Sequence, residues 1–400
     1  MKLAEKYGSP DERYSYKSAL IDELRRTKQP YVAGRLTITI AEKLGFCWGV
    51  DRAVAMVWDA IRRFPGRRLW LLNQIIHNPK VNEDFRQNGV QFIFGKYAEP
   101  GGFERVQRGD VAIIPAFSAE VEHLERMKAI GCEIVDTTCP WVEKPHRRVL
   151  KYLEDRFTTL IHGQPGHDET RATCSLVDSK GGKWLVVREL EDAHFLCAFL
   201  RGEVSAADAA ARLGANASRG FDFARDLELV GMVNQTTMLA SESREIARLV
   251  ADAVKARDAK RAAGPANFRD FDTICPATQD NQDAVIALTQ EIGPELVPDL
   301  FLVLGGYDSS NTANLLRAAR AKHGTYHVQE PTSITRDILR HRDPATGGEI
   351  STRDWLPPGP LRIALSAGAS TPDTELAAVI ARLCEAAGVS VTEVAAVTKP

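Results

Sequence analysis

The 400-residue sequence lacks any apolar run long enough to span a bilayer, and residues 1–29 lack the apolar core of a signal peptide. Acidic residues in that stretch also argue against a transit peptide. The sequence also lacks an excess of positive or negative charge, because it contains 51 Lys and Arg residues and 53 Asp and Glu residues. This balance favours neither a nucleic-acid nor a membrane-surface partner. We therefore predict a cytoplasmic protein that binds neither nucleic acid nor membranes.

Several common binding motifs are also absent. No Cys-x-x-Cys pair occurs, so the sequence does not support a zinc ribbon or a ferredoxin-like cluster run. Neither GxGxxG nor GxxxxGK[ST] occurs, so nucleotide binding is not favoured. The seven cysteines are odd in number and no secretion signal accompanies them, which makes disulfides an unfavourable interpretation. Metal binding or catalysis is the alternative use of these thiols.

What the sequence does contain is an alternation of strand-like and helix-like segments from Leu36 onward. With a length too great for one ordinary domain, this alternation predicts an α/β protein of two or three domains. Residues 189–226 are charged and rich in alanine, and we expect an insertion there with a helix over residues 205–213. Residues 331–360 are expected to form a polar connector.

Three cysteines share one local setting. Cys47, Cys139 and Cys275 each follow a strand-like segment and precede a helix-like one. A thiolate is stabilised near a helix N-terminus by the helix dipole and by free backbone N–H groups. Each cysteine alone is best interpreted as a small buried hydrophobe, but the three together predict one shared metal centre. Three thiolates suit a catalytic zinc or an iron–sulfur cluster with one iron that no protein atom binds. The other cysteines lack this turn and are expected to be structural: Cys132, Cys174, Cys197 and Cys384.

Five polar segments stand at the ends of strand-like runs. They are His77-Asn78-Pro79, His167-Asp168-Glu169, Asn234-Gln235-Thr236-Thr237, Ser309-Ser310-Asn311 and Ser370-Thr371-Pro372-Asp373. The ordinary interpretation is helix capping for the Ser, Thr and Asn residues and solvated loop for the rest. The functional interpretation is phosphate binding at the helix N-termini of the first, fourth and fifth segments, an imidazole and a proton-donating carboxyl in the second, and a hydrogen-bond relay in the third.

Together these segments resemble the LytB family of 4-hydroxy-3-methylbut-2-enyl diphosphate reductases. The ordered matches are GFCWGVDRAV (45–54), HNPKVN (77–82), DTTCPWV (136–142), HGQPGHDET (162–170), NQTTM (234–238), TICPATQDNQDA (273–284), GGYDSSNT (305–312) and SAGASTPD (366–373). The Cys-Trp-Gly, Pro-Trp-Val and Gln-Thr-Thr-Met variants resemble the longer plant and cyanobacterial branch.

The resemblance implies three similar α/β domains in a trefoil-like, pseudo-threefold arrangement around a central [4Fe–4S] cluster. Cys47, Cys139 and Cys275 would be its ligands and one iron would stay open. The implied reaction removes the C4 hydroxyl of an allylic diphosphate with two electrons and yields isopentenyl and dimethylallyl diphosphates. This is the last step of the non-mevalonate isoprenoid pathway. The implied electron donor is ferredoxin, with flavodoxin as the alternative.

By motif position, the resemblance also implies roles for single residues. Glu169 would deliver protons, with Thr236 favoured over Thr237 in the relay, and both threonines are counted among the substrate-binding residues. The other predicted substrate-binding residues are His77, His167, Ser309, Ser310, Asn311 and Ser370. One departure concerns the turn at residues 115–120, where many bacterial members carry a phosphate-binding histidine and this chain has none. Ser118 is the candidate hydroxyl donor in its place.

The predicted division is an N-terminal arm at 1–35, then α/β domains at 36–138, 139–272 and 273–400. Residues 36–48 are expected to pack with the third domain, which ends in a C-terminal tail. Two other functions stay open. One is a hydro-lyase with an open-iron cluster, which would need Arg clamps for carboxylates, and Arg52 is the only arginine in the candidate turns. The other is a cluster-bearing electron carrier or sensor, which would need no His167/Glu169 loop.

Overall fold

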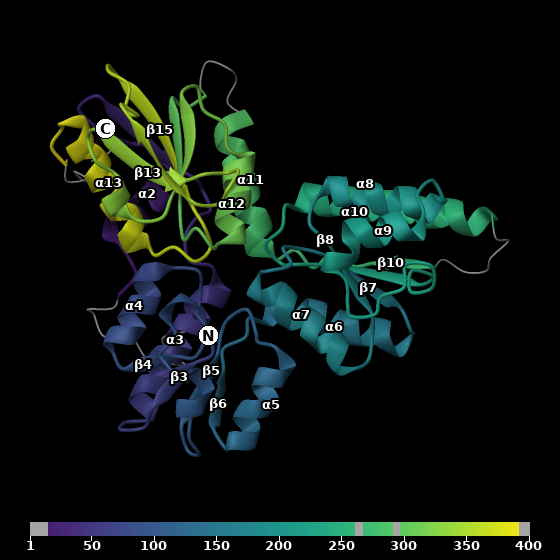
Figure 1. Cartoon of the computed structure of the whole chain (residues 1–400). Helices are drawn as coiled ribbons and strands as arrows, with labels where there is room; N and C mark the ends of the chain where they lie inside the picture. Colours follow the sequence, from purple (N-terminus) through teal and green to yellow (C-terminus); the bar gives the residue numbers. More distant parts are fainter. Residues whose placement is uncertain (1–14, 261–266, 291–296, 392–400) are drawn as a thin grey trace. The chain divides into compact units, whose positions relative to one another are not determined.

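The computed structural model describes residues 15–260, 267–290 and 297–391 (Figure 1). The chain divides into two compact units. The first contains residues 1–55, 76–85 and 276–400, and the second contains residues 56–75 and 86–275. Both units consist of mainly parallel sheets and helices, which confirms the predicted α/β class. Within the described residues, no helix is both long and apolar enough to cross a membrane.

The first unit is built on a five-stranded sheet. The strand order is β1 (Tyr31–Ala33), β2 (Leu36–Ile40), β15 (Leu361–Ala367), β11 (Leu300–Leu304) and β12 (Gly324–Val328). Only β1 is antiparallel to its neighbour, and β2 pairs in parallel with β15 from Leu36↔Leu361 to Ile40↔Leu365. The strand that precedes Cys47 is therefore hydrogen-bonded to a strand from the C-terminal quarter of the chain.

Helices cover both faces of this sheet. Successive side chains of a strand point to opposite faces. Leu300, Leu302 and Leu304 share a core with α2 (Ala19–Thr27) and α13 (Asp373–Ala387), whereas Phe301 and Val303 pack with α11 (Pro276–Gln290) and α12 (Ser310–Ala318). Burial on both faces explains the uninterrupted apolar run of β11.

The predicted N-terminal arm is described from residue 15 onward, and residues 1–14 lie outside the described residues. From Ala19 to Ala33 the arm forms α2 and β1, and Ile21 and Leu24 are buried in the core of the first unit. The predicted C-terminal tail is described only as far as residue 391.

The prediction of a connector at residues 331–360 is wrong. This segment contains a hairpin of β13 (Ile338–Arg342) and β14 (Glu349–Arg353), paired antiparallel. Both strands carry charged residues, and β14 is largely exposed. The alternation of apolar and polar residues that marks a half-buried strand is therefore too weak here to show in the sequence.

The second unit holds two fully parallel four-stranded sheets. One has the order β4 (Val90–Phe92), β3 (Leu69–Leu71), β5 (Val111–Ile114) and β6 (Glu133–Asp136). The other has the order β10 (Phe268–Asp270), β9 (Val230–Asn234), β7 (Thr158–His162) and β8 (Trp184–Val187). The main helices are α3 (Trp48–Arg63), α4 (Pro79–Gln87), α5 (Val121–Ile130), α6 (Pro140–Glu154), α7 (Asp168–Ser179) and α10 (Ala240–Lys260), of which α3 begins, and α4 mostly lies, in the first unit.

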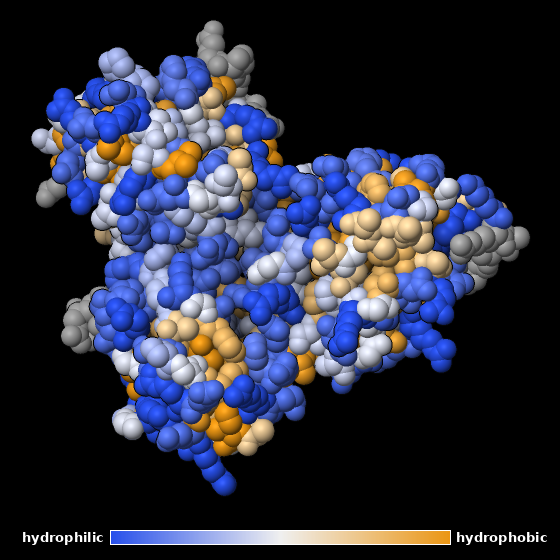
Figure 2. Space-filling view, viewed as in Figure 1, coloured by the Kyte–Doolittle hydropathy of each residue, from blue (hydrophilic) through white to orange (hydrophobic). Residues whose placement is uncertain are grey.

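The expected insertion forms two helices, α8 (Leu190–Arg201) and α9 (Ala206–Leu213). The helix predicted at residues 205–213 is confirmed, and the hydroxyl of Ser205 caps it by accepting the N–H of Asp208 at 3.2 Å. The sequence did not predict α8, which buries Leu196 and Leu200 against α10. Pale orange surface covers this region in Figure 2, where alanines of α9 are exposed.

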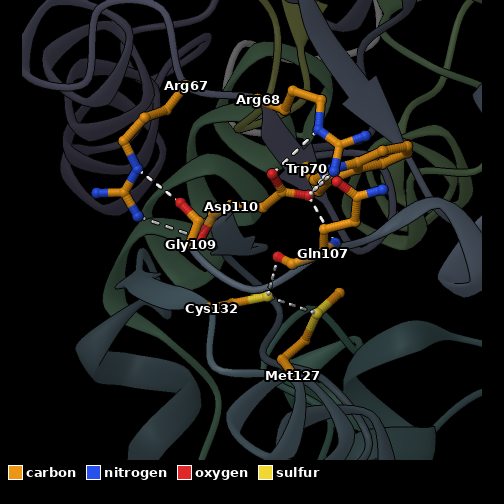
Figure 3. A network of polar contacts seen from close by, with 8 residues as sticks. All are labelled: Arg67, Arg68, Trp70, Gln107, Gly109, Asp110, Met127 and Cys132. Atoms are coloured by element: carbon orange, nitrogen blue, oxygen red, sulfur yellow. Dashed lines mark hydrogen bonds and ion pairs between the residues drawn. The ribbon is translucent and has the colours of Figure 1, made fainter.

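A buried carboxylate ties together the amino ends of β3 and β5 (Figure 3). Asp110 is 6% exposed and accepts hydrogen bonds from the Arg68 guanidinium at 2.7 and 3.0 Å and from the Trp70 indole at 3.0 Å. A charged partner and several donors together compensate for removing the carboxylate from water. This network is structural, because it lies at the amino ends of the strands.

The same arrangement of four strands occurs three times. Two adjacent strands lie at the centre of each arrangement: β3 and β5, β7 and β9, β11 and β15. The chain continues from the first two pairs to strands on opposite sides of the pair, and in the third pair β11 leads to β12 while β15 leads into α13. Ligands of open α/β sheets bind beyond the carboxyl ends of such a pair. The strands β6, β10 and β2 lie beside β5, β9 and β15, respectively. Each of these three outer strands leads to one of the predicted metal ligands, which are Cys139, Cys275 and Cys47 in the same order.

Candidate active site

In the second unit, the carboxyl group of Glu169 is held by one residue. Its Oε1 accepts the backbone N–H of Thr236 at 2.7 Å, and its Oε2 accepts the Thr236 hydroxyl at 2.8 Å. Glu169 lies in the first turn of α7 after β7, and Thr236 follows β9. Since β7 pairs with β9 up to His162↔Asn234, adjacent strands bring the acid and its partner to the same sheet edge.

Burial sets the acidity of this carboxyl group. Glu169 is 2% exposed, and desolvation raises its pKa to about 7 even though both Thr236 hydrogen bonds act to lower it. A carboxyl with a pKa near neutrality holds a proton that it can donate under physiological conditions. The group is therefore suited to protonate a leaving oxygen.

Thr236 also connects Glu169 to Cys275. The backbone N–H of Cys275 donates to the Thr236 carbonyl at 3.1 Å. Thr236 thus contacts the predicted proton donor through its hydroxyl and N–H, and a predicted metal ligand through its carbonyl. Two threonines were candidates for the relay. The Thr236 hydroxyl binds Glu169, whereas the Thr237 hydroxyl accepts a hydrogen bond from the Gln235 amide at 2.8 Å.

Gln235 holds the loop that carries His167 and Glu169, a role that sequence reasoning missed. Its Oε1 accepts the N–H of Gln164 at 2.9 Å and the hydroxyl of Thr170 at 3.1 Å. A Cβ at Gly163 would lie 2.8 Å from the Thr170 hydroxyl oxygen and 3.0 Å from the Gln235 Cβ. Glycine is therefore required for the loop to close this tightly.

His167 caps α7 and faces an aromatic ring. Its Nδ1 accepts the N–H of Glu169 at 3.2 Å, so the neutral ring carries its proton on Nε2, which is then a hydrogen-bond donor. The Phe117 ring stands edge-on to the imidazole at 5.8 Å. Phe117 belongs to the turn that lacks the histidine of many family members. Ser118, the proposed substitute, is half-buried in a left-handed conformation with φ of 71°.

Cys139 ends the turn after β6. It is the N-cap residue of α6, Pro140 occupies the first helical position, and the Cys139 N–H donates to the Ala116 carbonyl at 3.0 Å. Proline is favoured there because its fixed φ suits a helix start and its missing N–H would have no partner in the helix. The prolines after Cys139 and Cys275 therefore shape the two turns.

Cys47 lies in the first unit, where a salt bridge holds the preceding turn. The Arg25 guanidinium binds both carboxylate oxygens of Asp373 at 2.6 Å and the Leu44 carbonyl at 3.0 Å. The Cys47 N–H donates to the Ala369 carbonyl at 3.2 Å, and the Val50 N–H points at the Cys47 sulfur at 3.5 Å. An N–H directed at sulfur at the start of α3 favours a thiolate.

The same unit brings together most of the residues predicted to bind the diphosphate. Ser309 is the N-cap of α12, and its hydroxyl oxygen accepts the N–H of Thr312 at 3.2 Å. Asn311 accepts the N–H of Ala369, the residue before Ser370, at 3.0 Å. A Cβ at Gly306 would lie 2.3 Å from the His77 carbonyl oxygen, so the two turns touch. His77, Ser309, Ser310, Asn311 and Ser370 therefore lie in contacting turns, whereas His167 and Glu169 belong to the second unit.

A second buried acid supports the His77 turn, and sequence reasoning missed it. The Asn78 amide donates to the Glu375 carboxylate at 2.7 Å and accepts the N–H of Val81 at 3.0 Å, which caps α4. Glu375 is 8% exposed, and burial raises its pKa to about 7, partly opposed by the Asn78 bond and the Lys80 charge. Acids are common in the first turn of a helix, so the sequence contains no signal of this contact.

This raised pKa makes stability depend on pH. Glu375 titrates near its ordinary value of 4.5 when unfolded and near 7 when folded, so stability present below pH 4.5 is lost as the pH rises to 7. We expect Glu375→Gln, which keeps an acceptor for Asn78, to match the wild type at pH 4.5. At pH 8 we expect the variant to be more stable by up to about 3 kcal/mol.

Thermal midpoints of the iron-loaded protein at the two pH values measure this effect. The exposed Glu385 of the same helix provides a control, and Glu385→Gln should follow the wild type at both pH values. A Glu375→Gln variant that loses stability with rising pH as the wild type does would contradict the assignment.

The cysteines themselves fall into two groups. Burial raises the pKa of the Cys132, Cys174 and Cys384 thiols, and raises that of Cys197 to about 11. Such thiols are poor ligands and nucleophiles at neutral pH. Cys47, Cys139 and Cys275 are half-buried and reduced, and each adjoins the start of a helix.

This second group fits an iron–sulfur cluster, which is held by thiolates and tuned by hydrogen bonds to sulfur. In the described part of the chain, no group of three or more His, Cys, Asp or Glu side chains is arranged to hold a metal ion. Cys47 belongs to the first unit, and Cys139 and Cys275 belong to the second.

The repeated sheets, the three thiol-bearing turns and the buried acid define, as a class, an α/β iron–sulfur oxidoreductase. The family model described as "LytB protein" matches residues 38–384, and the chain belongs to this family. The resemblance stated from the motifs is thereby confirmed.

Curated relatives match over most of their length. A protein of Gloeobacter violaceus is 41% identical over 390 residues, which are 95% of this chain and 90% of that protein. A protein of Synechococcus sp. (strain CC9605) is 40% identical over 380 residues, covering 93% of this chain and 91% of that protein. Both are named 4-hydroxy-3-methylbut-2-enyl diphosphate reductase.

Two solved structures share the fold. One is described as (E)-4-hydroxy-3-methyl-but-2-enyl diphosphate reductase, the terminal enzyme of the non-mevalonate pathway. It is 26% identical with a TM-score of 0.51, covering 87% of this chain and 99% of that one. The other is a diphosphate reductase from Plasmodium falciparum, which is 19% identical with a TM-score of 0.61 and covers 89% of this chain and 88% of that one.

Proposed function

We propose that this chain is a 4-hydroxy-3-methylbut-2-enyl diphosphate reductase. It converts (E)-4-hydroxy-3-methylbut-2-enyl diphosphate to isopentenyl and dimethylallyl diphosphates, the last step of the non-mevalonate pathway. The observation that carries the proposal is the buried Glu169 carboxyl, bound twice by Thr236, whose carbonyl accepts the N–H of Cys275. The 41% identity to a reductase across 95% of the chain supports the same reaction.

Cys47, Cys139 and Cys275 would hold a [4Fe–4S] cluster with one iron that no protein atom binds. When bound, such a cluster supplies electrons and a Lewis-acidic iron. Support for this ligand set comes from the repeated sheets, since each cysteine follows the corresponding strand of its sheet. The N–H···S contact at Cys47 supports a thiolate there.

Glu169 holds the proton for the departing C4 hydroxyl. Its two bonds to Thr236 fix the direction of the carboxyl group, and burial raises its pKa to about 7, so that a substantial fraction of the molecules hold the proton near neutral pH. The Thr236 hydroxyl can pass a proton because it donates to Glu169 and has lone pairs left to accept. Thr236 and Thr237 are also among the substrate-binding residues, and the Thr237 hydroxyl accepts a hydrogen bond from the Gln235 amide.

The diphosphate is bound by neutral donors. His77, His167, Ser309, Ser310, Asn311 and Ser370 supply imidazoles, hydroxyls and an amide, and Ser118 adds a hydroxyl. The N-terminus of α12 lies at Ser310, where the helix dipole favours an anion. This set suits a diphosphate in a chain whose net charge is only −2.

The electron donor is ferredoxin, with flavodoxin as the alternative, and the protein acts in the cytoplasm. The domain boundaries at 35/36, 138/139 and 272/273, and the arrangement of the domains around one cluster, stay predictions. Among the residues that the structure describes, no contact favours the hydro-lyase or the electron carrier.

The test is turnover by the anaerobically purified protein. We expect iron and sulfide to accompany the chain, and reduced methyl viologen to drive consumption of the hydroxylated diphosphate with formation of both products. Protein with a full iron and sulfide content that leaves this substrate untouched would disprove the proposed function.

A further inference from the structure

One face of α6, beside Cys139, carries an exposed tryptophan. Trp141 is the second residue of the helix, two positions after Cys139, and it is 39% exposed. Large apolar side chains are exposed at only a few described positions: Val32, Trp48, Trp141, Ile350 and Val391. The two tryptophans among them adjoin Cys47 and Cys139 in the sequence.

Cations follow the same face. Trp141, Lys144, Arg148 and Lys151 are spaced i, i+3, i+7 and i+10, which places them on one side of a helix. We call these four residues the α6 stripe. The acids of the helix, Glu143 and Glu154, lie at other positions around it, and Glu143 pairs with Arg147. The stripe is therefore a basic surface with one aromatic residue at its cysteine end.

Ring contacts hold this surface in place. The Lys144 ammonium lies 5.4 Å from the Trp141 ring centre and 5.1 Å from that of Phe271, and it donates to the Asp272 carbonyl at 3.1 Å. The Arg148 guanidinium lies 3.7 Å above the Phe271 ring. Cation–π contacts pre-organise the cations without neutralising their charge. The strand β10 and the residues directly after it contribute exposed groups of both signs, namely Arg269, Asp270 and Asp272.

We propose that the α6 stripe docks an acidic one-electron carrier of the ferredoxin class. The inference rests on the proposed function, because that reaction consumes two electrons that a partner must deliver. Aromatic residues and arginine are enriched in binding surfaces, and complementary charge speeds encounter and orients the partner. Electron-transfer complexes are small and transient, so a single helix face is of suitable size. Docking here brings the carrier next to Cys139.

The electron count agrees with such a partner. Two successive dockings deliver two electrons, and each carrier molecule is oxidised by one. With two protons, the C4–O bond breaks, the oxygen leaves as water, and a C–H bond forms at C2 or C4. Formation of this bond at C2 gives isopentenyl diphosphate, and formation at C4 gives dimethylallyl diphosphate.

The test compares two reductants in one variant. Lys144→Glu combined with Arg148→Glu reverses the charge of the stripe, and Lys128→Glu combined with Arg225→Glu reverses exposed charges elsewhere. We expect the stripe variant to raise KM for reduced ferredoxin about tenfold or more and to flatten its salt dependence, because screened charge–charge attraction is lost. Turnover with methyl viologen should stay within about twofold of the wild type, as should both activities of the control.

The double variant Lys144→Gln with Arg148→Gln removes the two charges without reversing them. The iron content of each variant confirms that it carries its cluster. A ferredoxin KM close to that of the wild type in both pairs overturns the proposal. Equal losses with both reductants in both pairs also overturn it, since the stripe would then serve the fold or the reaction itself. If the stripe variants raise KM for reduced flavodoxin but not for reduced ferredoxin, the proposed carrier is wrong. Wild-type protein inactive with viologen contradicts the proposed function instead, while direct ferredoxin binding to the loaded protein still tests the stripe.

Discussion

Glu169→Gln is expected to lower kcat by about 10²–10⁴-fold while the protein keeps its iron, because the amide has no acidic proton to donate. The substitution leaves the shape of the site nearly unchanged. The amide oxygen can still accept the N–H of Thr236, and the amide nitrogen can donate to the Thr236 hydroxyl. The measurement is turnover with reduced methyl viologen, with iron and sulfide determined on the same sample.

The pH profile gives this prediction a second readout. Since the pKa of Glu169 is raised to about 7, the wild type should lose kcat as the pH rises through neutrality and the proton is released. The residual activity of Glu169→Gln should lack this decline.

Asp168→Asn is the matched control, because Asp168 lies next to Glu169 in the same helical turn but binds the Asn73 amide. It should keep activity within a few-fold of the wild type. Turnover of Glu169→Gln near the wild-type rate would remove Glu169 from the proton path.

Cys275→Ser is expected to lose most of the iron and nearly all turnover. A serine hydroxyl is a poor substitute for a thiolate in a cluster that depends on Cys ligands. The backbone bond from residue 275 to the Thr236 carbonyl is retained in the variant, so the local fold should persist. Iron and sulfide per chain, with the anaerobic absorption spectrum, measure the loss. Cys47→Ser and Cys139→Ser should behave alike.

Cys132→Ser is the control for these variants. Cys132 is half-buried like the three predicted ligands, but its sulfur lies 4.0 Å from the Gln107 carbonyl and 3.9 Å from the Met127 sulfur, and burial raises its pKa. It should keep a full iron content. A Cys275→Ser protein with the iron, sulfide and colour of the wild type would show that Cys275 is not a ligand.

The sequence predicted local structure well wherever one segment determines it. The strand before Cys47 and the helix after it are β2 and α3, and the run around Cys139 is β6 followed by α6. Periodicity and turn chemistry act over a few residues, so they can be interpreted from the residues alone. The sequence did not predict β13 and β14, because both strands carry charged side chains and β14 is largely exposed. It also failed at α8, which lies within a stretch interpreted as an insertion.

Sequence patterns could not predict the side-chain contacts around the site. Gln235 stood in a quoted motif, yet only the fold shows that its side chain binds Gln164 and Thr170. Glu375 had no signal at all, because its partner Asn78 is 297 residues away in the sequence. A contact of this kind depends on which strands pair and in which register, and no local pattern encodes that.

The sequence by itself thus determined the family, the α/β class and the three cysteine turns, because these depend on motifs and on periodicity within short segments. Only the tertiary structure decided that Glu169 meets Thr236 and that Asn78 meets Glu375. It also decided that both acids have a pKa near 7, because desolvation arises from the surrounding side chains and exists only once distant segments have packed together.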